Sequence, residues 1–255
     1  MQLARRLVLG LSAAALLTAG PSVAQASFSV NYVVSAGGDN NAALNGLSAR
    51  GIWSVSGTQL SIQLINNSTG VPAGFDSADS LLTSVGFTLP NNLIILGNGP
   101  TAVIAPGSSG FGAWAGRTAS SSVADNYAFT NTFGGDLFDT GESLASRQVI
   151  STSQGSVGGG SATRFAPGPA LNGPSGGMSA QPPLVSTGGL FGVGNSIIFT
   201  VNLSGSITQA QLRQIANASS VECGSDARYL KIPAPGASAL LGLGGLLAAR
   251  RRRTA

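Results

Sequence analysis

The sequence feature that most constrains the fold is a period of two in the placement of apolar residues. In Gln59–Ile65, the apolar residues Leu60, Ile62 and Leu64 alternate with polar ones. Successive side chains of a strand point to opposite faces of a sheet, so this alternation predicts a strand with one buried and one polar face. Ser196–Leu203 has the same period and predicts a second such strand.

Other short segments rich in β-branched and aromatic residues lie between turn-rich stretches, a pattern typical of all-β domains. The additional strands predicted in this way are Phe28–Val34, Gly51–Ser56, Leu82–Leu89, Ala102–Ala105 and a late segment at 219–224. Ser56-Gly57 predicts a hairpin turn between two of the early strands. The expected fold is all-β: a single β-sandwich-like domain with long Gly/Ser-rich loops and one short helix.

The short helix is predicted by its N-terminal signals. Thr208 and Gln211 have the spacing of a capping box, and Ile207 with Leu212 have that of a hydrophobic staple. The residues expected to face the sheet are Leu212, Ile215 and Ala216.

Composition supports a folded body. The 255 residues include 37 Gly and 12 Pro, with 43% apolar and only 9% charged residues. Intrinsic disorder requires low hydrophobicity and high net charge, which this composition does not have. Residues 154–194 are rich in Gly, Ser and Pro and predict one long loop within one domain.

The N-terminus has the three parts of a secretory signal peptide. Arg5 and Arg6 precede an apolar run at 7–19, and the small-residue triplet Ala24-Gln25-Ala26 follows. The run is too short to span a membrane and ends in a cleavage pattern, which disfavours the alternative of a buried first helix. Residues 1–26 are therefore predicted to be removed at Ala24-Gln25-Ala26, so that the mature chain begins at Ser27.

The C-terminus has a second targeting pattern. Pro233, Ala234 and Pro235 precede a mostly apolar stretch at 236–249, which is followed by the basic cluster Arg250, Arg251, Arg252 and Arg253. As a helix this stretch would be about 21 Å long, against a hydrocarbon core of about 30 Å. It therefore predicts a transient membrane contact more readily than a permanent anchor, with the arginines on the cytoplasmic side.

This tail resembles the PEP-CTERM domain of exosortase-processed bacterial surface proteins. The resemblance covers residues 232–255, with Ile232 and Ala234 in place of the Val and Glu of the usual Val-Pro-Glu-Pro motif. It implies cleavage near Pro233-Ala234-Pro235 by an exosortase and delivery of the body, residues 27–231, to the cell surface or matrix. The alternative is an ordinary C-terminal membrane anchor. The body is also loosely similar to a group of exosortase-dependent surface proteins for which no activity carries over.

Processing would change the sign of the net charge. The full chain carries +4, whereas residues 27–231 hold seven cationic residues and nine carboxylates, a formal charge of −2. The basic excess thus lies in segments predicted to be removed. We therefore do not expect the body to bind nucleic acid.

Residue types limit the chemistry. The chain has no histidine, which excludes the Ser-His-Asp triad and imidazole metal ligands. Cys223 is the single cysteine, so an intramolecular disulfide or a thiolate zinc cluster is excluded, and a buried structural role in a late strand is expected.

Two groups of carboxylates remain as candidates. Such groups serve glycoside hydrolysis or bind Ca²⁺, although neither group has the spacing of a calcium loop, and turn stabilisation by Asp is favoured. The residues are Asp76 with Asp79, and Asp136 with Asp139 and Glu142. Four aromatic residues, Trp53, Phe111, Trp114 and Tyr127, suit a sugar-stacking platform, but core packing is favoured for them.

The sequence therefore predicts an exported surface or extracellular-matrix protein of structural or adhesive type, not an enzyme, and without a cofactor. The alternative is a secreted lectin-like carbohydrate-binding module, optionally assisted by Ca²⁺; a carboxylate-dependent hydrolase comes third. The expected partners are signal peptidase, an exosortase-like protease and a matrix polysaccharide, with the membrane contacted through the tail.

Overall fold

The strands predicted from alternation pair with one another in one antiparallel layer. The computed structural model describes residues 27–33, 45–74, 76–133, 147–153, 162–171, 176–181, 183, 191–224 and 228–232. In this layer the strand order is β5-β12-β3-β2-β1. The strands are β1 (Ser27–Val33), β2 (Ser48–Ser56), β3 (Gln59–Asn66), β5 (Ile95–Ile104) and β12 (Ser196–Leu203). We call this the first layer.

A second layer faces the first. Its strand order is β14-β13-β4-β8-β7-β9, again antiparallel. The strands are β4 (Leu82–Phe87), β7 (Ala128–Phe133), β8 (Arg147–Ser151), β9 (Thr163–Arg164), β13 (Ser220–Cys223) and β14 (Arg228–Lys231). The layers join through one residue pair, Val33 of β1 with Lys231 of β14.

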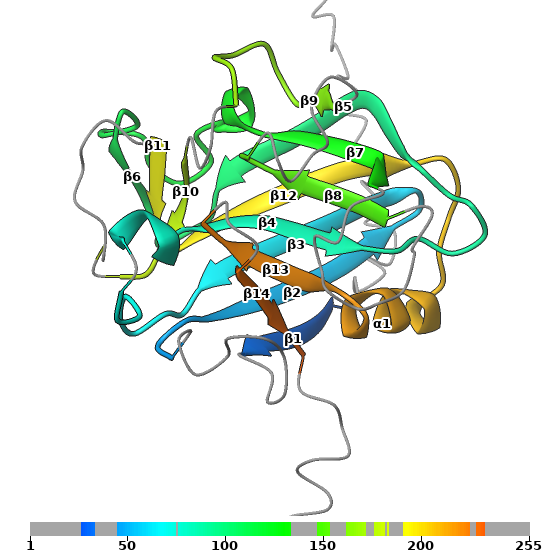
Figure 1. The fold of residues 1–255 in the computed structure, drawn as a ribbon. Coiled ribbons are helices and arrows are strands. Elements are labelled where there is room, and N and C mark those ends of the chain that lie inside the picture. Colours follow the sequence, from blue (N-terminus) through cyan, green and yellow to red (C-terminus); the bar gives the residue numbers. More distant parts are fainter. Residues whose placement is uncertain are drawn as a thin grey trace, which may run out of the picture.

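Three further strands extend from β4 at one end of the molecule. They are β6 (Ser109–Gly112), β10 (Gly176–Ser179) and β11 (Phe191–Gly194). Met178 of β10 pairs with Leu82 of β4, β11 runs parallel to β10, and β6 pairs with β11. Figure 1 shows this group beside the two stacked layers, with β13 and β14 in front of β2 and β1.

Large apolar side chains hold the two layers together. Trp53 of β2 meets Phe87 of β4 edge-to-face, with ring centroids 5.4 Å apart. Tyr127 and Phe199 make a similar contact at 4.8 Å. All four rings are buried, and each lies on the face of its layer that points at the other layer. The result is the β-sandwich-like, all-β fold that the alternation predicts.

The hairpin between β2 and β3 is confirmed. The two strands pair from Ala49–Asn66 to Ser56–Gln59, with Gly57 in the connecting turn at φ +61°. A positive φ favours glycine, which lacks the Cβ that makes this conformation costly. The hairpin register places Trp53 beside Ile62 on the inner face.

The helix α1 (Gln209–Asn217) is also confirmed, together with its capping box. Thr208 Oγ1 accepts from the Gln211 backbone N–H at 3.2 Å, and Gln211 Oε1 accepts from the Thr208 N–H at 2.8 Å. The helix lies between β12 and β13 in sequence and packs against β1 and β2. Its buried residues are the three expected ones, Leu212, Ile215 and Ala216.

The prediction of one long loop at 154–194 is wrong in part. Within its described residues the structure has β9, β10 and β11, whose Gly- and Ser-rich sequences carry little strand signal. Glycine has a packing reason here: a Cβ on Gly176 would collide with the Phe191 carbonyl, and one on Gly192 with the Phe111 ring. These strands therefore require residues that sequence propensity counts against a strand. The strands β6, β7, β8 and β14 were not predicted either.

Two 3₁₀ helices complete the described elements, η2 (Ser77–Ser80) and η3 (Ala124–Asn126). Within the part of the chain that the structure describes, no helix has the length and apolar character needed to cross a membrane.

Candidate functional site

The targeting residues predicted from sequence lie outside the described residues. These are Ala24 and Ala26, the motif Pro233, Ala234 and Pro235, and the cluster Arg250 to Arg253. The strand β1 begins at Ser27, the residue that follows the expected cleavage position. Signal and sorting functions therefore stay predictions.

Of the two clusters of carboxylate residues predicted from the sequence, the structure describes one. Asp76 and Asp79 cap η2: the Asp76 N–H donates to Asp79 Oδ2 at 2.9 Å. This confirms the expected turn-stabilising role. Asp136, Asp139 and Glu142 lie outside the described residues. Among those that are described, no three His, Cys, Asp or Glu side chains gather as metal ligands would.

The aromatic residues considered for a sugar platform are mostly core residues. Trp53, Trp114 and Tyr127 are 0–1% exposed, and Phe111 is half-buried on β6. Their burial confirms the core-packing interpretation and excludes the three buried rings as a surface for stacking. Cys223 is fully buried in β13, as expected.

Tyr32 adds a polar contact inside this core. Its hydroxyl lies 2.7 Å from Ser219 Oγ and accepts from Trp53 Nε1 at 3.3 Å. Burial raises the pKa of Tyr32 to about 12, partly offset by these two hydrogen bonds. The contacts connect β1 and β2 to Ser219, which lies between α1 and β13, so we assign Tyr32 a structural role.

A cavity of about 520 Å³ lies at one end of the first layer, where three separate segments meet. The segments are the end of β3 with the residues after it, the residues after β10, and the residue between β11 and β12. The lining consists of side-chain amides, hydroxyls and one methyl: Asn66, Asn67, Ser68, Thr69, Ala180, Gln181 and Asn195. We call this cavity the amide pocket.

Asn66 holds the wall of the amide pocket in place. Its Nδ2 donates to the carbonyls of Ser80 at 2.8 Å and Met178 at 2.7 Å, and its Oδ1 accepts from the Ser68 N–H at 2.9 Å. The side chain is 2% exposed. The amide N–H groups and the amide oxygen of Asn66 are thus used to connect the end of β3 to η2 and β10.

Asn195 forms the opposite wall in a conformation that few residues adopt. Its φ is +89°, in a region that asparagine tolerates better than most residues other than glycine. Its N–H donates to the Ser179 carbonyl at 2.7 Å, and its carbonyl accepts from the Asn66 N–H at 3.0 Å. Both bonds hold the strained backbone in place, and such strain often marks a functional position.

The groups that remain available to a ligand are neutral. Within the described part of the chain, the side chains of Asn67, Thr69 and Asn195 make no hydrogen bond. Gln181 makes one at 3.4 Å to the Gly194 carbonyl, which leaves most of its amide available. An amide offers two donors and an acceptor, and a hydroxyl offers both roles. The amide pocket can therefore hold a neutral ligand that has donors and acceptors side by side.

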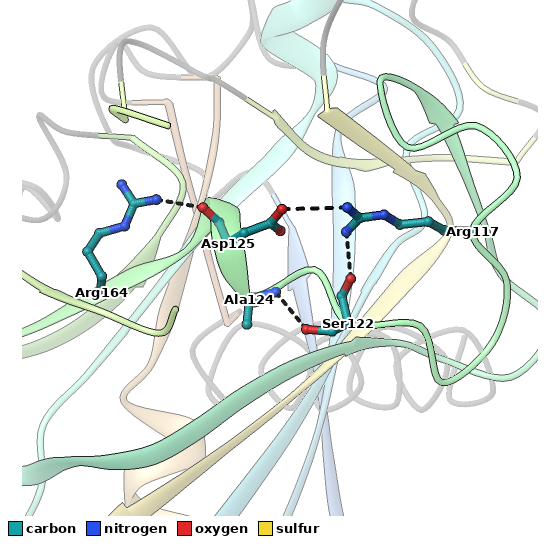
Figure 2. A network of polar contacts seen from close by, with 5 residues as sticks. All are labelled: Arg117, Ser122, Ala124, Asp125 and Arg164. Carbon is teal, nitrogen blue, oxygen red and sulfur yellow. Dashed lines mark hydrogen bonds and ion pairs between the residues drawn. The ribbon is translucent and has the colours of Figure 1, made fainter. Parts of the chain in front are cut away.

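Charged residues form a separate cluster around η3 (Figure 2). Arg117 lies 3.5 Å from Asp125 and donates to the Ser122 carbonyl at 2.6 Å, while Arg164 donates to the Asp125 carbonyl at 2.5 Å. Arg117 also lies over the Trp114 ring, 5.2 Å from its centroid. These contacts connect β9 and the segment after β6 to η3, so we assign the cluster a structural role.

Glu222 is a buried carboxylate that sequence reasoning missed. Alternation with Val221 and Cys223 predicts an outward, solvated position, yet Glu222 is 0% exposed. Its Oε2 accepts from Ser84 Oγ at 2.7 Å, and Ser84 Oγ lies 2.7 Å from Ser151 Oγ. These three residues occupy neighbouring positions on β13, β4 and β8.

Sequence reasoning also missed the amide pocket, because its walls are about 130 residues apart in the chain. In the sequence, Asn66-Asn67-Ser68-Thr69 is a short polar stretch after a predicted strand and gives no sign of the residues that it meets. A comparison with protein-family models, with curated proteins and with solved structures finds no match for this chain.

Proposed function

We propose that this chain is an exported surface or extracellular-matrix protein of adhesive type, which attaches to the matrix by binding a neutral carbohydrate in the amide pocket. The observation that carries this proposal is the lining of the pocket: the described residues that form it provide four side-chain amides and two hydroxyls and include no charged residue. It is a binding function and involves no catalytic step.

The chemistry of the lining matches that of a sugar. Each sugar hydroxyl is both a donor and an acceptor, and the amides of Asn67, Gln181 and Asn195 provide both roles at neighbouring points. A volume of about 520 Å³ is within the range of roughly 300–1,000 Å³ that is usual for small-ligand sites. Because the described lining residues include no cation, an anionic sugar would lose hydration there without gaining a charged partner, so a neutral sugar is favoured.

Export is supported by how the folded body relates to the two ends. The first strand begins at Ser27, directly after the proposed signal cleavage, and the last described strand ends at Lys231, just before the Pro233-Ala234-Pro235 motif. We propose signal peptidase and an exosortase-like protease as the processing partners, with membrane contact through the tail before cleavage. The surface location follows from these two steps.

Asn195→Gly provides the sharpest test of the pocket. Glycine adopts φ +89° without strain, so this change removes the amide and leaves the backbone conformation intact. Loss of one or two hydrogen bonds to a sugar, at about 1 to 1.5 kcal/mol each, should weaken binding about tenfold or more. The measurement is a neutral glycan array followed by calorimetry on the purified protein.

The matched control is Asn91→Gly. Asn91 also has a positive φ, +55°, but lies in the turn after β4 and is not part of the pocket lining. We expect this variant to bind as the unchanged protein does. Failure of the unchanged protein to bind any neutral glycan, or equal binding by the Asn195→Gly variant, would contradict the assignment of the pocket.

Processing is tested by the intact mass of the protein recovered from the cell surface or medium. We expect a chain that begins at Ser27 and has lost the sequence beyond the Pro233-Ala234-Pro235 region. A variant with Pro233 and Pro235 replaced by alanine should keep its tail. A surface form that retains Arg250 to Arg253 would contradict cleavage by an exosortase. It would not contradict carbohydrate binding by the body.

A further inference from the structure

The outward face of the first layer carries its side chains in straight rows. In an antiparallel sheet, paired residues on neighbouring strands point to the same side. Residues that pair across the layer therefore form a row perpendicular to the strands. The register places five hydroxyl residues in one such row: Ser27, Ser54, Ser61, Thr200 and Thr101.

The hydroxyls of this row are available to a ligand. The five residues are exposed or half-buried, and within the described part of the chain their side chains make no hydrogen bond. Four strand spacings of about 4.8 Å give the row a length of roughly 19 Å. We call it the hydroxyl row.

The row beside it is largely apolar. This second row is two residues away from the hydroxyl row along each strand. In the same cross-strand order, its members are Ser29, Ile52, Gln63, Ile198 and Val103. Ile52, Ile198 and Val103 are each half-buried in a face with no covering element in the described structure. A sugar ring has a hydroxyl edge and an apolar C–H face. A polar row beside an apolar row complements both surfaces.

Charge on this face is nearly absent. In the rows from β1 to β5, Arg50 is the one charged residue among those described, and its Nε already donates to Ser29 Oγ at 2.7 Å. A polymer with a charge on every sugar would therefore find a single charged group, Arg50, among the described residues of this face. A neutral chain would find hydrogen-bonding groups and apolar contact at the same time.

The outward face leads directly to the amide pocket. Along β3 the outward side chains are Ser61, Gln63 and Ile65, and the alternation continues to Asn67. The Asn67 N–H donates to the Ser48 carbonyl at 2.9 Å, so the ladder with β2 continues at this point. Asn67 lines the pocket and also belongs to the outward series. Pocket and face thus share one border.

We infer that the ligand is a neutral polysaccharide chain, with one end or one residue held in the amide pocket and the following sugars lying across the outward face of the first layer. This inference rests on the proposed function and names its ligand class as a polymer. The hydroxyl row bonds the sugar hydroxyls, and the apolar row contacts the ring faces. Affinity therefore rises with chain length.

The test compares short and long probes on one protein. The probes are cello-, laminari-, manno- and xylo-oligosaccharides of two and six units, measured by calorimetry. For the series that binds, we expect the six-unit probe to bind at least tenfold more tightly than the two-unit probe. Equal affinity for both lengths would overturn the inference while leaving the pocket assignment intact.

Variants on the face separate it from the pocket. In a double variant, Ser61→Ala with Thr200→Val, two hydroxyls are removed with little change in volume. We expect the affinity for the six-unit probe to fall about tenfold, towards that of the two-unit probe, whose own affinity is unchanged. Thr163→Val, on β9 of the second layer, is the control and leaves both affinities as they were.

The remaining outcomes are decisive as well. If the double variant keeps the full advantage of the long probe, the face does not contact the ligand and the inference is wrong. If the long probe binds and depends on the face, but Asn195→Gly changes nothing, the pocket assignment fails and the face alone is the site. If no probe binds, both are overturned.

Discussion

Replacing Trp53 with alanine should lower the free energy of unfolding by about 3–5 kcal/mol, the range seen for large aromatic residues deleted from a core. The ring is 0% exposed and contacts Phe87 of the opposite layer, so its removal opens a cavity between the two layers. It also removes the hydrogen bond from Trp53 Nε1 to the Tyr32 hydroxyl. Urea denaturation followed by circular dichroism measures the loss.

The control for this prediction lies on the same strand. Ile52 is adjacent to Trp53 but points outward and is half-buried, so Ile52→Ala should cost about 1 kcal/mol or less. A loss at Trp53 no greater than that at Ile52 would mean that the two layers do not pack through this residue. The fold described above would then need revision.

Replacing Asn66 with alanine should lower the free energy of unfolding by about 2–4 kcal/mol. The change leaves the buried carbonyls of Ser80 and Met178 and the Ser68 N–H without their side-chain partner. Each unsatisfied buried group costs roughly 1–3 kcal/mol, and partial relaxation reduces the sum. Thermal and urea unfolding provide the measurement.

Two matched variants sharpen the result at Asn66. Asn66→Asp keeps the shape but replaces the amide donor, which serves two carbonyls, with a carboxylate oxygen, so it should destabilise the protein at neutral pH at least as much as alanine does. Asn67→Ala, one residue away and exposed, should change stability by no more than about 0.5 kcal/mol and reduce only carbohydrate binding. Similar stability losses at both positions would refute the role given to Asn66.

The strand around Trp53 and the helix α1 show where sequence reasoning succeeds. The strand around Trp53 was predicted because β-branched and aromatic residues cluster there, and its burial followed from an apolar strand. The helix was predicted because the spacing of Thr208, Gln211 and Leu212 is a local signal that needs no distant partner. Both signals lie within a few residues, so they are visible in one segment of sequence.

Strands in which contacts with other strands require glycine could not be predicted from local sequence signals. In β10 and β11 the glycines stand where the Phe191 carbonyl and the Phe111 ring leave no room for a Cβ. That constraint comes from other strands and is visible only once they are in place. Glu222 shows the converse case, because its alternating sequence predicts exposure and only the packed structure buries it.

The candidate site depended on tertiary structure even more. Asn66, Gln181 and Asn195 each look like ordinary loop or strand-end residues in the sequence. They line one cavity because β3 pairs with β12, and because the Asn195 N–H reaches the carbonyl of Ser179 at the end of β10. The pairing of β3 with β12 joins residues more than a hundred positions apart, so no local pattern contains it.

The sequence by itself determined the all-β class, the principal strands of the first layer and the capped helix, because periodicity and capping are short-range properties of the chain. It also supplied the expectation of export, which rests on the linear order of residues at the two ends. Only the tertiary structure decided which strands meet, which polar residues are buried and where neutral amides converge. Those outcomes depend on long-range strand register, and register is settled by how two separate faces pack together.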